Sequence, residues 1–122
     1  MAQTLDKAHG TQTATIGTEH TLDTETGSGV YVVVVNTKNM VNGDELELRA
    51  YTKVLTGDSQ HWLIFEGSYK HQTGDGADAG SSAGGEVLKV SPPVSTPFSV
   101  KFTLKQTAGT GRSFDWRVDQ LA

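Results

Sequence analysis

Residues 30–35 form an unbroken apolar run of five valines and one tyrosine. β-Branched and aromatic side chains disfavour a helix and fit the pleated surface of a strand. A run that is apolar at consecutive positions is typical of a strand covered on both faces, and it would invite aggregation if it were exposed. The pattern therefore predicts a buried strand in the centre of a sheet.

Residues 45–54 alternate strictly between apolar and polar positions. This period of two predicts a half-buried strand. Its core face carries Leu46, Leu48, Ala50, Thr52 and Val54, and its polar face carries Glu45, Glu47, Arg49, Tyr51 and Lys53.

Further strands are predicted at residues 61–69 and 86–90. Near the end of the chain, the alternating segments 98–105 and 114–119 flank a glycine-containing turn. We expect these two segments to pair as an antiparallel hairpin, with Trp116 in the core.

The remaining segments are polar. Residues 12–16 and 19–25 predict short edge strands, and residues 1–11, which show no period, predict a mobile N-terminal arm. Residues 72–85 contain five glycines and no large apolar side chain, which predicts a mobile surface loop. The three prolines in residues 92–97 predict an extended connection.

Short strands separated by turn signals, without any helical period, predict an all-β fold. The expected architecture is a single-domain antiparallel β-sandwich of jelly-roll or immunoglobulin-like type. Residues 12–122 are expected to form this domain, preceded by the arm at residues 1–11. A chain of 122 residues is long enough for one such core.

Composition narrows the possible functions. The absence of cysteine excludes a disulfide scaffold, a thiolate zinc site and a cysteine nucleophile. Ten basic against 14 acidic residues give a net charge of −4, which argues against a nucleic-acid partner. We expect neither membrane binding nor export, since residues 1–6 lack the features of a signal peptide and no apolar run approaches a bilayer span.

No pattern favours catalysis, so we expect no enzyme, cofactor or metal. The serine-elbow motif Gly-x-Ser-x-Gly is absent. Residues 109–113 fit a hairpin turn better than a phosphate loop, because no helix pattern follows. Asp75 and Asp78 are too few for a calcium loop. The histidines lack a close second ligand and are expected on the solvated surface: His9, His20, His61 and His71.

The aromatic side chains offer one candidate contact. Trp62, Tyr69, Trp116 and Tyr51 are compatible with a sugar-stacking platform, but core packing is the simpler interpretation for Trp116. Tyr51 is the better candidate for an exposed contact because it lies on the polar face of its predicted strand.

Two blocks of sequence resemble a known group of proteins. One comprises residues 29–36, 39–40, 43–44 and 46–49, and the other is residues 102–116. Together they are similar to small structural proteins of tailed bacteriophage virions, most like the capsid decoration (cement) proteins. Asp115 departs from the group, in which proline is common between the two aromatic residues.

The resemblance implies a non-enzymatic protein on the capsid exterior of the virion, made in the host bacterial cytoplasm. It would bind the major capsid protein, stabilise contacts between shell subunits and form a dimer or trimer on the particle. The arm would order on its neighbour by adding a strand. The candidate partner-binding residues are therefore Gln3, Thr4, Leu5, Asp6 and Lys7, together with Tyr51.

Two other functions remain open at this point. The chain is also compatible with a phage tail or baseplate component, such as a tube, adaptor or fibre part. The second is a host-glycan-binding β-sandwich module, which would use exposed aromatic side chains.

Overall fold

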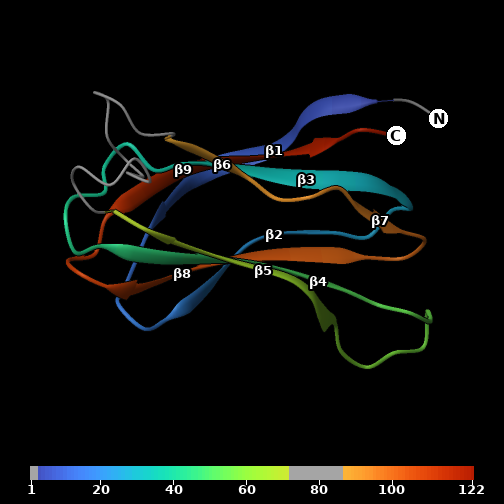
Figure 1. Cartoon of the computed structure of the whole chain (residues 1–122). Coiled ribbons are helices and arrows are strands. Elements are labelled where there is room, and N and C mark those ends of the chain that lie inside the picture. The colour runs from blue at the N-terminus through green and yellow to red at the C-terminus, as the bar shows by residue number, and fades with distance from the viewer. Residues whose placement is uncertain (1–2, 72–86) are drawn as a thin grey trace.

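Two antiparallel sheets pack face to face in the computed structural model, which describes residues 3–71 and 87–122 (Figure 1). Sheet A has the order β1 (Thr4–Thr13), β9 (Ser113–Gln120), β3 (Gly29–Asn36) and β6 (Leu88–Val90), with β7 (Val94–Thr96) also paired to β3. Sheet B has the order β2 (Glu19–Glu25), β8 (Val100–Ala108), β4 (Glu45–Thr52) and β5 (Trp62–Lys70). The predicted all-β, single-domain sandwich is confirmed.

The order of the strands distinguishes between the two expected topologies. The chain passes from sheet A to sheet B and back through β1, β2, β3 and β4, and β4 pairs with β5 before the chain returns to sheet A. In an immunoglobulin-like sandwich the first two strands are neighbours in one sheet. Here they lie in different sheets, so the arrangement is that of a jelly roll.

The core lies between the two sheets. Its fully buried members come from alternate positions along four strands. In β4 this is the period of two predicted for residues 45–54. They are Tyr31, Val33 and Val35 of β3; Leu46, Leu48 and Ala50 of β4; Val100, Phe102 and Leu104 of β8; and Phe114 and Val118 of β9. On the outward side of β3, Val32 and Val34 are also buried, which confirms a central strand covered on both faces.

The predicted C-terminal hairpin is wrong. β8 lies in sheet B between β2 and β4, whereas β9 lies in sheet A between β1 and β3. The turn between them crosses the sandwich, so each strand sends its apolar face into the same core from the opposite side. Alternation shows that one face is buried but not which strand lies alongside, and a crossing and a hairpin therefore share one pattern.

The N-terminal segment also differs from the expected arm. Residues 4–13 form β1, which pairs antiparallel with β9. Polar side chains are compatible with this position because β1 is an edge strand whose backbone bonds to a central one. The pairing is interrupted between Thr4 and Ala8, where the register shifts.

Smaller differences occur at strand ends. Val54, predicted on the core face, is exposed because β4 ends at Thr52. A short strand, β7, lies within the connection predicted to be extended. The predicted loop at residues 72–85, with Asp75 and Asp78, falls outside the described residues.

Candidate functional site

The outward face of sheet B carries charged side chains centred on Arg49. Alternation along β4 places Arg49 opposite Glu66 of β5. The guanidinium donates from Nε to Glu66 Oε2 at 2.8 Å, from Nη2 to Glu47 Oε1 at 2.8 Å and from Nη1 to Glu19 Oε1 at 3.2 Å. One arginine thereby joins β2, β4 and β5 across the face of the sheet.

Glu19, at the start of β2, is a second centre of the same face. The Tyr51 hydroxyl and the Thr103 hydroxyl each donate to Glu19 Oε2, both at 2.5 Å. Partial burial alone would raise the pKa of Glu19, but these hydrogen bonds and the positive charges of Arg49 and Lys101 outweigh it. The pKa is therefore below its ordinary value, and the carboxylate is charged at neutral pH.

Tyr51 lies within this face, on the polar side of β4 as the alternation predicted. Lys101 Nζ lies 4.8 Å from the centroid of its ring, which is a cation–π geometry. Burial, followed by the hydrogen bond to Glu19, raises the pKa of the phenol. Tyr51 is half-buried and held at both ring and hydroxyl, and its contact with a partner stays a prediction.

These side chains form one pre-organised polar surface, which we name the Arg49 cluster. It contains three carboxylates and two cations, and Lys105 lies directly opposite Glu19 and Glu47 on the same face, so the charges are balanced. Side chains already held in place lose less entropy when a partner binds. The members of the cluster are Arg49, Glu19, Glu47, Glu66, Tyr51, Lys101 and Thr103.

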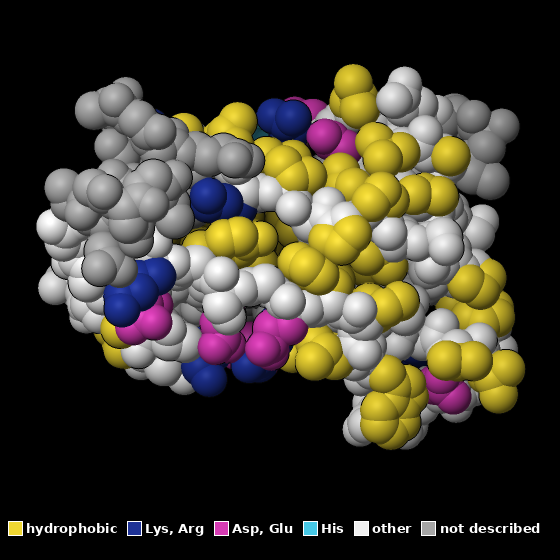
Figure 2. Space-filling view, in the orientation of Figure 1, with side chains coloured by type: hydrophobic (Ala, Val, Ile, Leu, Met, Phe, Trp, Pro, Cys, Tyr) yellow, Lys and Arg dark blue, Asp and Glu magenta, His cyan; other side chains and the backbone are white. Residues whose placement is uncertain are grey.

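An exposed apolar patch adjoins the cluster at the β4–β5 end of sheet B. Figure 2 shows hydrophobic side chains gathered over this turn, at the lower right. Five large apolar side chains there are between 53 and 72 % exposed, and together they form what we name the β5 patch: Val54, Leu55, Trp62, Leu63 and Ile64. Large apolar side chains exposed together at one end of a sheet are typical of an interaction site.

The N-terminal candidate residues lie in the other sheet. Leu5, Asp6 and Lys7 form the irregular part of β1, where Asp6 adopts a φ of 55°. The Asp6 backbone N–H donates to Asp119 Oδ1 at 2.7 Å, and this bond fixes the irregularity against β9. Gln3 and Thr4 are exposed beside it. The structure therefore does not bring the N-terminal candidates together with Tyr51.

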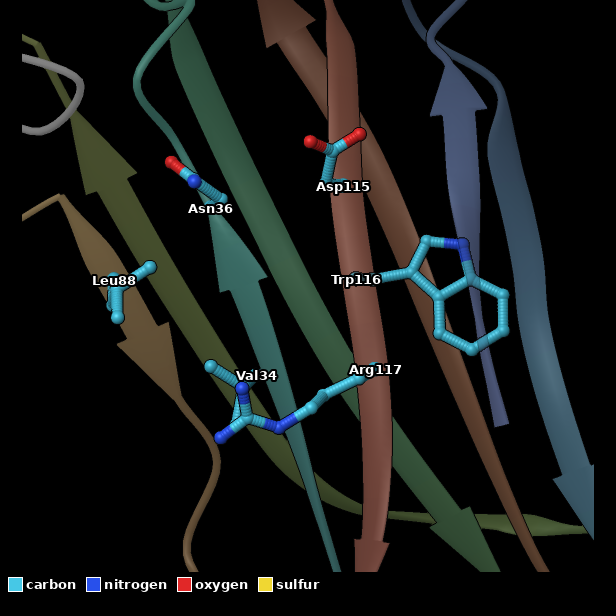
Figure 3. Close-up of a pocket in the computed structure, with 6 residues that line it drawn as sticks. All are labelled: Val34, Asn36, Leu88, Asp115, Trp116 and Arg117. Carbon is cyan, nitrogen blue, oxygen red and sulfur yellow. The ribbon is translucent and has the colours of Figure 1, made fainter. Parts of the chain in front are cut away.

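A shallow depression of about 200 Å³ lies on sheet A, lined by six residues shown in Figure 3: Val34, Asn36, Leu88, Asp115, Trp116 and Arg117. Trp116 points away from the other five, toward β1, where it packs over Gly10. Arg117 donates to Asp119 at 3.2 Å, and Asp115 accepts from Thr11 at 2.7 Å. These polar groups are already paired within the chain, so the depression offers few groups to a ligand.

Sequence reasoning missed an acidic pair on β2. A register shift between Thr21 and Asp23 turns Asp23 and Glu25 toward the core side, opposite Phe102 and Val100. Burial, and after it the neighbouring Asp23, raises the pKa of Glu25 to about 7. Asp23 Oδ2 is buried and has no hydrogen-bond partner among the described residues. The irregular alternation of residues 19–25 was the only sign of the shift.

The four histidines lie apart. His9 bonds Asp6 at 2.9 Å, His20 accepts from the Thr15 backbone at 3.0 Å, and His61 lies 2.7 Å from the Ser99 hydroxyl. His71 is buried, so the expected surface position is wrong for this residue. Within residues 3–71 and 87–122, no three metal-binding side chains gather in one place.

Comparison of the chain with protein-family models, curated proteins and solved structures gave no match. The part of the chain that the structure describes holds no helix of the length and apolarity needed to span a bilayer.

Proposed function

We propose that this protein is a non-enzymatic structural component of a tailed bacteriophage particle. Within the particle it acts as a capsid decoration protein that binds the outer head shell and stabilises contacts between major capsid subunits. The sequence blocks that resemble phage structural proteins support this assignment. The jelly-roll sandwich is compatible with it, since this fold is common in viral coat components.

The observation that carries the proposal is the arrangement of the Arg49 cluster beside the β5 patch. Hydrogen-bonded polar side chains of β2, β8, β4 and β5 form a pre-organised surface, and the adjoining patch supplies exposed apolar area. A surface with ordered charges beside exposed apolar side chains suits docking onto another protein.

The copy number of this chain in purified particles tests the proposal. Quantitative mass spectrometry against the major capsid subunit should give a ratio near one, or a simple fraction of it, because decoration sites repeat with the shell lattice. A few copies per particle would instead indicate a tail or baseplate component. Complete absence from particles would overturn the assignment.

Variants of the cluster test the surface itself. Arg49→Ala removes the side chain that joins three strands, and it should weaken binding to capsids that lack the protein. Tyr51→Phe keeps the ring and its contact with Lys101 but removes the hydroxyl that donates to Glu19, so a smaller loss is expected. Lys38→Ala, on an exposed loop, serves as the control that should bind as the unchanged protein does.

A host-glycan-binding module is the alternative that the exposed Trp62 favours, since its side chain is 54 % exposed. Tyr51 is less suited to stacking on a sugar because Lys101 already occupies one face of its ring. Binding of the protein to host glycans that is lost in Trp62→Ala would support this alternative over decoration.

A further inference from the structure

β5 leaves one edge of sheet B open. Among the described strands only β4 pairs with it, so the other edge presents the backbone N–H and C=O groups of a nine-residue strand. Proteins commonly protect such edges with bulges, prolines, charges or short strands, because an open edge readily pairs with another strand.

The other described edges carry these protections. β1 is interrupted at Leu5–Lys7, and β2 shifts register at Leu22. β6 and β7 have three residues each and are separated by a segment that contains Pro92 and Pro93. β5 has one irregularity, at Ile64, and its residues 65–70 stay in unbroken register with β4. This regular half of β5 is the least protected edge.

The charges on β5 are arranged so that the strand complements itself. Glu66 and Lys70 are its charged residues, four positions apart with Ser68 between them, and all three are exposed. In an antiparallel pair, a two-fold axis through Ser68 sets Glu66 of each copy directly opposite Lys70 of the other. Opposite charges in this position stabilise a strand pair, whereas an axis through Glu66 would oppose two like charges.

The Arg49 cluster makes the same pairing favourable. Glu66 belongs to this cluster and is held in place by Arg49, while its side chain remains 41 % exposed. Lys70 forms no ion pair with another described residue. A second copy would therefore bring its Lys70 to a carboxylate that is already oriented.

We propose that β5 pairs antiparallel with β5 of a second copy about a two-fold axis at Ser68. The two B sheets then form one continuous sheet of eight strands, and the contact is identical on both copies. This inference does not depend on the proposed function, because it follows from the edge and its charges alone.

A charge exchange tests the pairing. Glu66→Lys and Lys70→Glu each set like charges opposite one another, and each should weaken self-association about tenfold in sedimentation equilibrium. An equimolar mixture of the two variants restores opposite charges at both positions and should form a heterodimer. Lys38→Glu makes the same change in net charge as Lys70→Glu but on an exposed loop, and it should associate as the unchanged protein does.

A crosslink tests the position of the axis. The chain contains no cysteine, so a single Ser68→Cys substitution introduces one thiol per copy. Directly opposite residues have Cβ atoms about 4.5–5.5 Å apart, close to the span of a disulfide. Ser68→Cys should therefore give a disulfide-linked dimer under mild oxidation, whereas Leu88→Cys on β6 should stay monomeric.

Three results would overturn the pairing. The unchanged protein would sediment as a monomer at its highest soluble concentration, or the two charge variants would fail to associate when mixed. The third is a Ser68→Cys variant that crosslinks no faster than Leu88→Cys. A protein that stays monomeric and uses its β5 edge only to pair with a different protein would also overturn the pairing.

Discussion

Arg112 donates from Nε to Asp44 Oδ2 at 2.8 Å, and this contact joins two loops that are 68 residues apart in the sequence. The Asp44 side chain is 1 % exposed. It also accepts from the backbone N–H groups of Val41 at 2.9 Å and Thr110 at 3.3 Å. Asp44 therefore holds the loop before β4 against the crossing between β8 and β9.

Removal of this carboxylate should destabilise the protein. Asp44→Ala leaves Arg112 and two backbone N–H groups without their acceptor, and we expect a loss of roughly 3 kcal/mol in the free energy of unfolding. Urea denaturation measures it. Asp58→Ala is the matched control, since Asp58 accepts two backbone N–H groups in a more exposed turn. A loss no larger than that of the control would contradict the assigned role.

Two glycines share the same backbone conformation but differ in the space around them. Replacing each by alanine therefore separates the cost of backbone strain from the cost of steric crowding. Gly43 and Gly109 have φ values of 93° and 92°. A Cβ at Gly43 would meet nothing within 4 Å, so Gly43→Ala should cost about 1–2 kcal/mol for the conformation alone. A Cβ at Gly109 would lie 2.9 Å from Asp44 Cα, and Gly109→Ala should cost roughly 3–5 kcal/mol. Equal losses in thermal or urea unfolding would show that the crossing tolerates a side chain.

The two tryptophans should differ in their effect on stability. Trp116 packs partly buried against the core and over Gly10, so Trp116→Ala should cost about 3 kcal/mol. Trp62 is 54 % exposed on the β5 patch, and Trp62→Ala should change stability by no more than about 0.5 kcal/mol. Comparable melting temperatures for the two variants would contradict the observed packing.

Glu25 should make the protein less stable as the pH rises. Its pKa is about 7 in the folded protein and near its ordinary value of 4.5 in the unfolded chain. Between these values the folded protein binds more protons, so the contribution of Glu25 is full below about pH 4.5 and is lost as the pH rises through 7.

Glu25→Gln should remove this dependence. The difference in unfolding free energy between the variant and the unchanged protein should grow from pH 5 to pH 8 in favour of the variant. Comparison with the variant is needed because the lowered pKa of His61, caused by burial and nearby lysines, acts in the opposite direction below pH 6.5. Glu45→Gln provides the same chemical change on β4, and a difference of equal size there would refute the assignment to Glu25.

The sequence predicted those features of the fold that depend on the side chains of a single strand. The valine run of β3 and the alternation of β4 each reflect which faces are buried, and both were confirmed. Pairing partners are a relation between distant segments, so the pattern could not show that β8 and β9 belong to different sheets. β1 was missed for a related reason, because an edge strand needs a neighbour's backbone more than apolar side chains.

The candidate surfaces were predictable only in part. The outward position of Tyr51 followed from the alternation along β4. Its partners Glu19 and Lys101 belong to strands that only the sheet topology places beside β4. The Asp23–Glu25 pair depends on a single register shift in β2, which reverses the direction of every later side chain. Such a shift leaves almost no trace in the composition of the strand.

The crossing between β8 and β9 has a consequence for biosynthesis. β8 separates β2 from β4 in one sheet, and β9 separates β1 from β3 in the other, so strands made after the others occupy inner positions in both sheets. The earlier strands have no completed sheet to join until β9 has emerged. Folding is therefore dominated by contacts between distant segments, which makes it slow for a chain of this length.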